Sequence, residues 1–226
     1  MINSLSVIIP VHNEVQNIRI NLSKIYDKLS KYDFDFEIII IDSESKDGSS
    51  EELKKFREFK KIKVIYEDNK SGWGSAVKKA LKIVEKKFVV FFPIDNQYKI
   101  DSIIKICLEN NTSVITYRGN QYINLIRYIR SIAYKKLCKL LFKLDFKEIN
   151  SIKILNFEEF KKDINFNSLP DDWFFELELL KKMKQKKIPF TEKPIELHKR
   201  EIGQSTIGFL DSFKMLIKLF RIYFRD

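Results

Sequence analysis

The segment FVVFFPIDNQ, residues 88–97, places a carboxylate and an amide directly after an apolar run. Such a run is typical of a strand that is buried on both faces of a parallel sheet. Ligands of open α/β sheets bind beyond the carboxyl ends of these strands, and oxygen ligands there suit a hard cation and the phosphates it carries. Asp95 and Gln97 are therefore candidate metal ligands. Because an Asp after a strand is also a common turn residue, this segment alone leaves both interpretations open.

Polar residues follow three more apolar segments in the first half of the chain. The polar segments are HNE at 12–14, DSESKDGS at 42–49 and NKSGWGS at 69–75. The carboxyl ends of parallel strands meet at one edge of a sheet, so we expect all four groups of polar residues to converge. Each also has an interpretation as a helix cap or a turn. For Asp47 and Ser49, capping and ligand binding are equally good interpretations.

The order of the elements predicts an α/β protein with a mostly parallel central sheet and helices on both faces. Strand patterns alternate with amphipathic helix patterns, as in right-handed βαβ units. The strand patterns cover residues 6–10, 36–41, 62–66, 88–92 and 113–117, and the helix patterns cover 13–29, 49–59, 74–86 and 101–110.

The second half of the chain has a different pattern. It predicts a long basic helix at 121–143, a helix at 172–187, a strand at 190–197 and a last helix at 207–224. Pro194 predicts an edge position or a bulge for that strand. Since no repeat or linker interrupts the chain, we expect one catalytic domain over 1–206 and a basic amphipathic helix over 207–226.

The overall composition favours anionic partners. The 226 residues include 42 Lys and Arg against 31 Asp and Glu, a net charge of +11, which suits nucleotides, acidic lipid or nucleic acid. Cys107 and Cys138 lie in apolar segments, which predicts reduced core thiols in a cytoplasmic protein. The first residues show no secretory pattern, and no uncharged run reaches the roughly 18 residues that a membrane span needs.

Two nucleotide-binding motifs are absent from the sequence. There is no G-x-x-x-x-G-K-[ST] loop, and the turn at 10–14 has no glycine, so we do not expect a redox dinucleotide enzyme. No RRM, KH or helix-turn-helix signature is present either. Nucleic acid is therefore not expected as a partner, although a non-enzymatic basic nucleic-acid-binding protein is an alternative that the charge allows.

Four segments in order resemble the motifs of the family 2 glycosyltransferases. They are SVIIPVHNE at 6–14, EIIIIDSESKDGS at 37–49, GWGSAVKKAL at 72–81 and DNQ at 95–97. The second half, with Arg118, Glu176 and HKREIGQS at 198–205, resembles the dolichol-phosphate-mannose synthase and polyprenyl-phosphate glycosyltransferase branch. The order and spacing of the motifs carry this resemblance over about residues 5–207.

The resemblance implies a GT-A (Rossmann-like) fold and an inverting glycosyltransferase. Such an enzyme moves a sugar from a nucleotide sugar, such as GDP-mannose or a UDP-hexose, to a polyprenyl or dolichyl phosphate, with Mg²⁺ or Mn²⁺ as cofactor. The implied donor-binding residues are Pro10, His12, Glu14, Asp42, Asp47, Gly74 and Asp95. The implied metal ligands are Asp95 and Gln97, and the implied catalytic residues are Asp95 and Arg200. The implied contacts to phosphate or acceptor are Arg118, Arg130, Arg200 and Ser205.

The chain departs from the pattern of this family at three places. Pro93 replaces the first Asp of the metal motif, Lys86 and Lys87 replace a Gly-Asp pair, and Glu148 replaces an Asp. Altered sugar specificity and an inactive paralogue are both compatible with these changes.

The chemistry of the acceptor separates two alternatives. A phosphate monoester is largely dianionic at neutral pH and needs no general base, whereas a sugar hydroxyl in a polysaccharide or lipid-linked glycan does. Asp171 and Asp172 are the candidate bases, and helix capping is the favoured interpretation of both.

The last helix predicts contact with a membrane surface. Its basic residues form one narrow stripe and its apolar residues cover most of the remaining circumference, as in helices that lie on anionic lipid. The stripe consists of Lys214, Lys218, Arg221 and Arg225. Because the helix at 121–143 repeats the pattern, we expect a cytoplasmic protein that is peripheral on the membrane, with a membrane-anchoring partner protein as a further expectation. A core helix with a solvated basic edge is the alternative.

Overall fold

The computed structural model describes residues 1–118, 125–199 and 209–225. Within these residues the chain forms a seven-stranded sheet with the order β3-β2-β1-β4-β6-β5-β7. The strands are β1 (Ser4–Val11), β2 (Asp35–Ser43), β3 (Ile62–Glu67), β4 (Phe88–Phe91), β5 (Ser113–Tyr117), β6 (Lys153–Asn156) and β7 (Phe190–Pro194).

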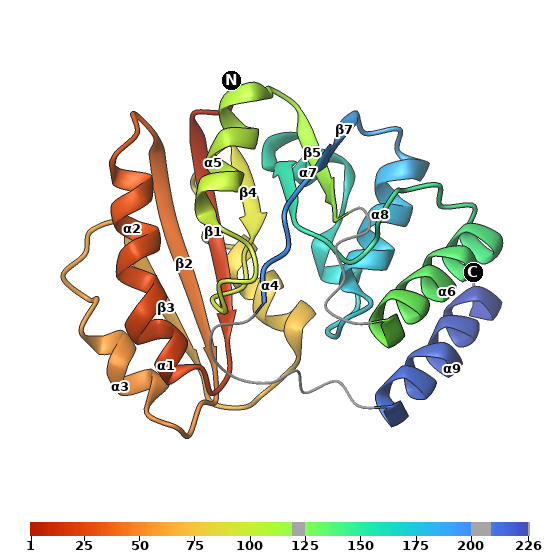
Figure 1. Cartoon of the computed structure of the whole chain (residues 1–226), viewed down its shortest axis with the longest axis horizontal. Helices are drawn as coiled ribbons and strands as arrows, with labels where there is room; N and C mark the ends of the chain where they lie inside the picture. The colour runs from red at the N-terminus through yellow and green to blue at the C-terminus, as the bar shows by residue number, and fades with distance from the viewer. Residues whose placement is uncertain (119–124, 200–208, 226) are drawn as a thin grey trace.

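Six of the seven strands run in the same direction. β1 pairs in parallel with β2 and β4, β2 with β3, and β5 with β7, whereas β6 is antiparallel to β4 and to β5. Their carboxyl ends therefore meet at one edge of the sheet, which we call the carboxyl edge (Figure 1). The predicted mostly parallel α/β fold is confirmed. β7 is an edge strand, as its proline predicted.

The strand β6 was not predicted, and it changes the surroundings of β4. β6 runs antiparallel to β4, within a sheet that was predicted to be mostly parallel. A segment of four residues is too short to show a period, so its pairing became visible only in the fold.

Apart from α7, the helices match the predicted segments with shifted ends, and the predicted helix at 13–29 is divided in two. They are α1 (Val15–Asn17), α2 (Ser23–Ser30), α3 (Ser49–Lys54), α4 (Trp73–Leu81), α5 (Ile100–Glu109), α6 (Leu125–Phe142), α7 (Phe157–Asp163), α8 (Phe175–Gln185) and α9 (Phe209–Arg225). A π-helical segment, Ile18–Leu22, joins α1 to α2, and a 3₁₀ turn, Phe166–Ser168, follows α7. α7 was not predicted, and α3 is shorter than the predicted 49–59 because the chain turns after Lys54.

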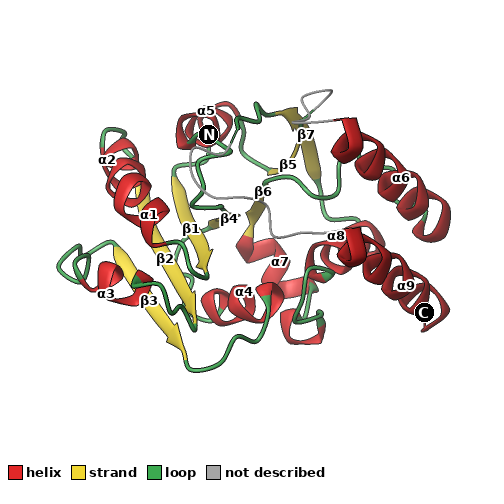
Figure 2. Cartoon of the chain, turned by 60° about the horizontal axis from the view of Figure 1, so that its bottom comes forward, coloured by secondary structure: helices red, strands yellow, loops and turns green. Residues whose placement is uncertain are grey.

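Two apolar layers cover the sheet. Along β2, Ile38 and Ile40 enter the layer beneath α2 and α5, and Ile39 and Ile41 enter the layer that includes α4 and α8. Figure 2 shows these helices on the two sides of the sheet. Burial on both faces explains why the strands read as continuous apolar runs. Cys107 and Cys138 are buried in different layers and form no disulfide.

The start of α4 packs directly on backbone from the second half of the chain. A Cβ atom on Gly74 would lie 2.3 Å from the carbonyl oxygen of Pro170, and one on Gly72 would lie 2.6 Å from that of Asp171. The amide of Ser75 donates a hydrogen bond of 2.9 Å to the same Asp171 oxygen. These two glycines are therefore required by a close backbone contact, and at Gly72 also by a positive φ of 101°.

Replacing Gly74 by Ala should destabilise the protein, because the new methyl group has no room beside the Pro170 carbonyl. We expect a loss of about 1–3 kcal/mol in the free energy of unfolding, measured by urea denaturation. Lys82→Ala, at the exposed end of the same helix, is the control and should unfold like the parent. Equal stability of all three proteins would contradict the packing role.

Candidate active site

The loops that follow β1 and β2 interlock at the carboxyl edge. The ring of His12 donates from Nδ1 to the carbonyl oxygen of Ser43 at 2.7 Å, which leaves Nε2 to accept from Asn13. The amide of Asn13 donates to Ser45 Oγ at 2.9 Å, and its side-chain oxygen accepts from Lys46 N at 2.8 Å. Asn13 has a φ of 57°, a left-handed conformation that Asn tolerates. The polar segments at 12–14 and 42–49 therefore meet, as predicted.

Asp47 holds the starts of two helices together. Its Oδ2 accepts from Val15 N at 3.0 Å at the start of α1, and its Oδ1 accepts from the amide of Ser49 at 3.0 Å at the start of α3. The Ser49 hydroxyl in turn accepts from Glu14 N at 2.9 Å. Burial alone would raise the pKa of Asp47, but the hydrogen bonds from Ser49 and Val15 outweigh it, so the pKa lies below its ordinary value. Asp47 thus accepts the first amide of each helix from outside the N-cap positions, which are Glu14 and Gly48.

Two buried carboxylates end the strands β2 and β3. Asp42 accepts from Ser50 Oγ and from Ser45 N. Glu67 accepts from Ser71 Oγ at 2.9 Å and also contacts Ser43 and Lys79. Burial alone would raise the pKa of Glu67, but the hydrogen bonds from Lys79, Ser43 and Ser71 outweigh burial, so the pKa lies below its ordinary value. Sequence reasoning missed Glu67, although its place as the last residue of an apolar strand was a usable signal.

The loop after β4 is held rigidly at the same edge. Gln97 N donates to Asp95 Oδ1 at 3.2 Å, Asn21 Nδ2 donates to the Ile94 oxygen at 2.9 Å, and His198 N donates to the Gln97 oxygen at 2.8 Å. Asp95 and Gln97 are both buried, and Asn21 is supplied by the π-helical segment. Such one-turn segments are frequent at functional sites.

The residues of this loop fit a cation that takes most of its ligands from substrate. Within the described part of the chain, His, Cys, Asp and Glu form no group of three that could hold a metal. Mg²⁺ commonly binds through one or two carboxylates plus substrate phosphates and water. A single carboxylate at Asp95, with the Gln97 amide beside it in sequence, is compatible with that mode and not with a metal cage made only of protein.

A polar cleft of about 380 Å³ lies beside this loop. Asn21, Lys24 and Lys28 line it from the π-helical segment and α2, and Asn96 and Lys99 line it from the β4–α5 loop. Its lysines add positive charge near the loop that carries Asp95.

A second group of charged residues lies where β5 ends and β6 begins. Arg118 follows β5 and is buried against Glu148: the guanidinium pairs with the carboxylate, and the Arg118 amide donates to Glu148 Oε2 at 2.9 Å. Lys153 opens β6 and donates to Glu176 Oε2 at 2.7 Å. Because β6 runs antiparallel to β5, the start of one lies at the end of the other, on the carboxyl edge.

Lys153 is a fully buried cation that sequence reasoning missed. Burial lowers its pKa and so does the nearby Arg118, while Glu176 opposes both. A buried charge of this kind depends on its partner, since removing one member of such a pair leaves the other uncompensated. The unpredicted strand β6 therefore supplies a second cation beside Arg118.

The loop before α8 joins the two halves of the edge. Asp172 Oδ1 accepts from Phe174 N at 3.0 Å, and its Oδ2 pairs with Lys218 of α9. The ring of Trp173 stacks on that of Trp73, with centroids 6.1 Å apart and an angle of 13° between the planes. Both oxygens of Asp172 are thus in structural contacts, and Asp171 pairs with Lys78 at 2.5 Å. The predicted capping role is wrong for both, because the N-cap of α8 is Phe174 and no side chain caps this helix.

The structure places most of the predicted site residues at this edge. Pro10, His12 and Glu14 lie at the end of β1 or just after it, and Asp42 and Asp47 lie at the end of β2 and beyond. Gly74 starts α4 and contacts the backbone of Pro170 instead of open space. Arg130 lies within α6. Arg200 and Ser205 lie outside the described residues.

Comparison with known proteins decides the family. The model of the glycosyl transferase family 2 matches residues 6–144. This chain belongs to glycosyl transferase family 2. The match covers the strands β1 to β5 and the loops with Asp42, Asp47 and Asp95. The predicted glycosyltransferase is thereby confirmed at the level of the family.

Solved structures share the fold over nearly the whole chain. Glucosyl-3-phosphoglycerate synthase from Mycobacterium tuberculosis, in complex with Mn²⁺, UDP and glucosyl-3-phosphoglycerate, has a TM-score of 0.69 at 15% identity, covering 98% of this chain and 80% of that one. Mannosyl-3-phosphoglycerate synthase from Rubrobacter xylanophilus has a TM-score of 0.68 at 14% identity, with coverage of 98% and 74%. The mannosyltransferase PcManGT from Pyrobaculum calidifontis, in complex with GDP-mannose and Mn²⁺, has a TM-score of 0.62 at 16% identity. The match covers 98% of this chain and 64% of that one. These likenesses confirm the GT-A fold.

Asp47→Ala should destabilise this family 2 chain in a pH-dependent way. Loss of a carboxylate that accepts the first amides of two helices should cost, like the loss of a cap, about 1 kcal/mol in the free energy of unfolding at pH 7. Since the folded-state pKa of Asp47 is depressed below its ordinary value of 3.8, its contribution is present above that value and is lost as the pH falls through the folded pKa. Urea unfolding at several pH values should show the two proteins converging in acid. Asp68→Ala, in an exposed loop, is the control, and a pH-independent difference for Asp47→Ala would contradict this account.

Proposed function

We propose that this protein is an inverting glycosyltransferase that uses Mg²⁺ or Mn²⁺ to move a sugar from a nucleotide sugar to a polyprenyl or dolichyl phosphate. The observation that carries the proposal is the meeting of the β1, β2 and β4 loops at the carboxyl edge of a family 2 fold, with Asp95 buried in a braced loop. Related folds have been crystallised with UDP or GDP-mannose and Mn²⁺.

In this proposal the first half of the chain binds the donor. Pro10, His12 and Glu14 contact the nucleotide from the end of β1, and Asp42 and Asp47 contact it from the end of β2. Asp95 and Gln97 hold the cation, which when bound neutralises charge on the departing diphosphate. The loops are already braced by hydrogen bonds, so little reorganisation is needed when the donor binds.

The second half of the chain provides the phosphate contacts of the acceptor. Arg118 and Arg130, with Arg200 and Ser205, are the residues we assign to them. A phosphate oxygen carries its own negative charge and needs no general base. The hydrogen bond and the ion pair of Asp172 support a phosphate acceptor over a sugar hydroxyl, because a carboxylate with both oxygens occupied is a poor base.

A phosphorylated small acid is a second candidate acceptor. It is favoured by the names of two structural neighbours, which make glucosyl- and mannosyl-3-phosphoglycerate. A sugar hydroxyl of a polysaccharide or lipid-linked glycan remains the alternative that the sequence raised.

A lipid-linked acceptor implies work at a membrane surface. We propose that residues 1–206 form the catalytic domain and that the protein is cytoplasmic and peripheral on the cytoplasmic membrane, with a membrane-anchoring partner protein as a further component. Among the described residues, every helix is too short or too polar to cross a bilayer.

Asp95→Asn tests the proposed metal site. With Mn²⁺ present, UDP or GDP should raise the melting temperature of the parent protein, because a ligand that binds only the native state stabilises it. The variant should lose the Mn²⁺-dependent part of this shift, and its transfer rate should fall at least about a hundredfold. Asp68→Asn, an exposed Asp in the loop after β3, should keep both. Retained metal-dependent activity in Asp95→Asn would sink the assignment.

A competition among acceptors tests the rest of the proposal. The full chain, a radiolabelled nucleotide sugar and Mn²⁺ are incubated with polyprenyl phosphate in detergent, with 3-phosphoglycerate, or with a hydroxyl-bearing glycan. We expect label in the organic phase with polyprenyl phosphate, and we expect Asp172→Asn to retain it. Label only in a water-soluble phosphate ester would establish the second candidate instead. Label in the glycan that is lost in Asp172→Asn would establish the hydroxyl alternative.

A further inference from the structure

The helix α9 carries two apolar stripes on opposite sides. Leu219 and Ile222 are 0% and 5% exposed and belong to the core layer of α4 and α8. Ile217, Phe220 and Phe224 are 43%, 41% and 81% exposed. At about 100° per residue, the second set points away from the first. The sequence showed one wide apolar surface, and the structure divides it into a buried stripe and an exposed one.

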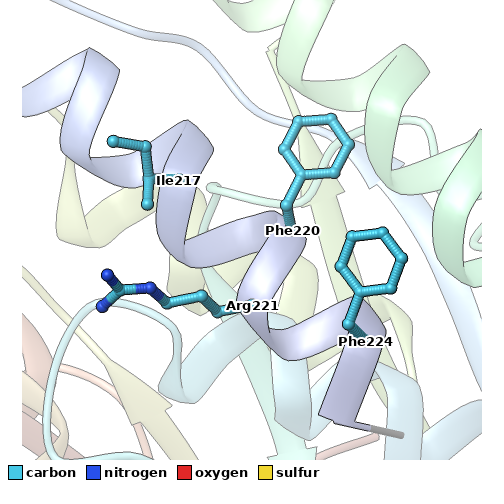
Figure 3. A pocket seen from close by; sticks show the side chains of 4 residues that line it. All are labelled: Ile217, Phe220, Arg221 and Phe224. Atoms are coloured by element: carbon cyan, nitrogen blue, oxygen red, sulfur yellow. The ribbon is translucent and has the colours of Figure 1, made fainter.

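The exposed stripe forms a coherent surface, which we call the outer face of α9. It consists of Ile217, Phe220, Arg221 and Phe224, which come from successive turns and line a shallow hollow of about 520 Å³ (Figure 3). Clusters of large apolar side chains on a protein surface mark sites of association, whereas single ones need no explanation. Arg221 is the only charged member of the outer face.

The charge of the neighbouring helix α6 and of the whole chain favours an anionic occupant of the outer face. α6 lies beside α9 in both views (Figures 1 and 2), and the ring centroids of Phe142 on α6 and Tyr223 on α9 are 6.0 Å apart. α6 exposes Lys135 and Lys136, and near its end Leu140 is 76% exposed. The whole chain carries a charge of +11. Two copies meeting through this end would bring like charges together, whereas acidic lipid headgroups would attract it.

The dimensions also suit a helix that lies flat on a membrane. α9 has 17 residues and is therefore about 25 Å long. It does not qualify as a membrane span. Its inner side is fixed, because Leu219 and Ile222 are in the core and Lys218 pairs with Asp172. The outer face is exposed and can insert, and a long basic side chain such as that of Arg221 can reach the headgroups from there.

We propose that the outer face of α9 inserts into the surface of an anionic lipid bilayer while the inner face stays in the protein core. This inference deepens the proposed function, on which it rests for the lipid acceptor. It assigns membrane contact to Ile217, Phe220, Arg221 and Phe224. It also fixes which side of the protein faces the membrane. Lys218 of α9 pairs with Asp172, and the loop of Asp172 packs on the start of α4.

Vesicle binding by the full chain tests the proposal. The probes are vesicles of phosphatidylcholine alone and of phosphatidylcholine with phosphatidylglycerol, separated by flotation. We expect binding that requires phosphatidylglycerol and weakens with salt. Phe220→Ala/Phe224→Ala should lower the partition coefficient at least about tenfold, because two large apolar side chains no longer enter the bilayer. Tyr32→Ala/Ile83→Ala, at sites 43% and 37% exposed away from α9, should bind like the parent.

A charge variant separates the specific contact from net charge. Arg221→Gln should weaken binding to the anionic vesicles more than Lys161→Gln, which removes the same charge from an exposed site on α7. Equal effects of these two variants would overturn the role of Arg221. Unchanged binding of the double phenylalanine variant would overturn the whole proposal.

Two further measurements identify other outcomes. Analytical ultracentrifugation would reveal a dimer that is lost in Phe220→Ala/Phe224→Ala, and such a dimer without vesicle binding would assign the outer face to a second copy and overturn the proposal. The melting temperature and its shift with UDP and Mn²⁺ should be the same in all variants. Vesicle binding without any transfer to polyprenyl phosphate would refute the proposed acceptor while leaving this inference intact.

Discussion

The parallel alignment of β1 with β2 on one side and β4 on the other is the constraint on which the rest of the structure depends. β1 pairs through eight residues with β2 and through four with β4. Because these strands are parallel, every loop that leaves their carboxyl ends must start at the same edge. The hydrogen bonds among His12, Ser43, Asp47 and Val15 exist because this pairing brings the first two loops together.

The second half of the chain reaches the same edge through an antiparallel strand. β6 runs antiparallel between β4 and β5, so the residue that opens it, Lys153, lies beside Arg118, which follows β5. The close contact of Gly72 and Gly74 with the backbone of 170–172 then ties the loop before α8 to the start of α4. Residues from the two halves of the chain are thus held at this edge by two non-local contacts, one between strands and one between loops.

Much of the first half was predictable because its signals are local. The apolar runs at 6–10, 36–41 and 88–92 are strands, and the polar residues after them meet where parallel strands require. The strand β6 and helix α7 were missed, since short segments show no usable period. Glu67 and Lys153 were missed for a related reason: their partners, Lys79 and Glu176, are distant in sequence, and only the fold brings each pair together.

By itself the sequence determined the α/β class, the order of the first strands along the chain, the family resemblance and the basic, apolar character of the last helix. Each of these depends on residue type and on spacing along the chain. The tertiary structure decided which glycines meet backbone, which carboxylates hold the loops of the carboxyl edge together, and that α9 has one apolar stripe in the core and another facing outward. Those properties depend on what lies opposite each side chain, and a periodic pattern records the direction of a side chain without recording its neighbour.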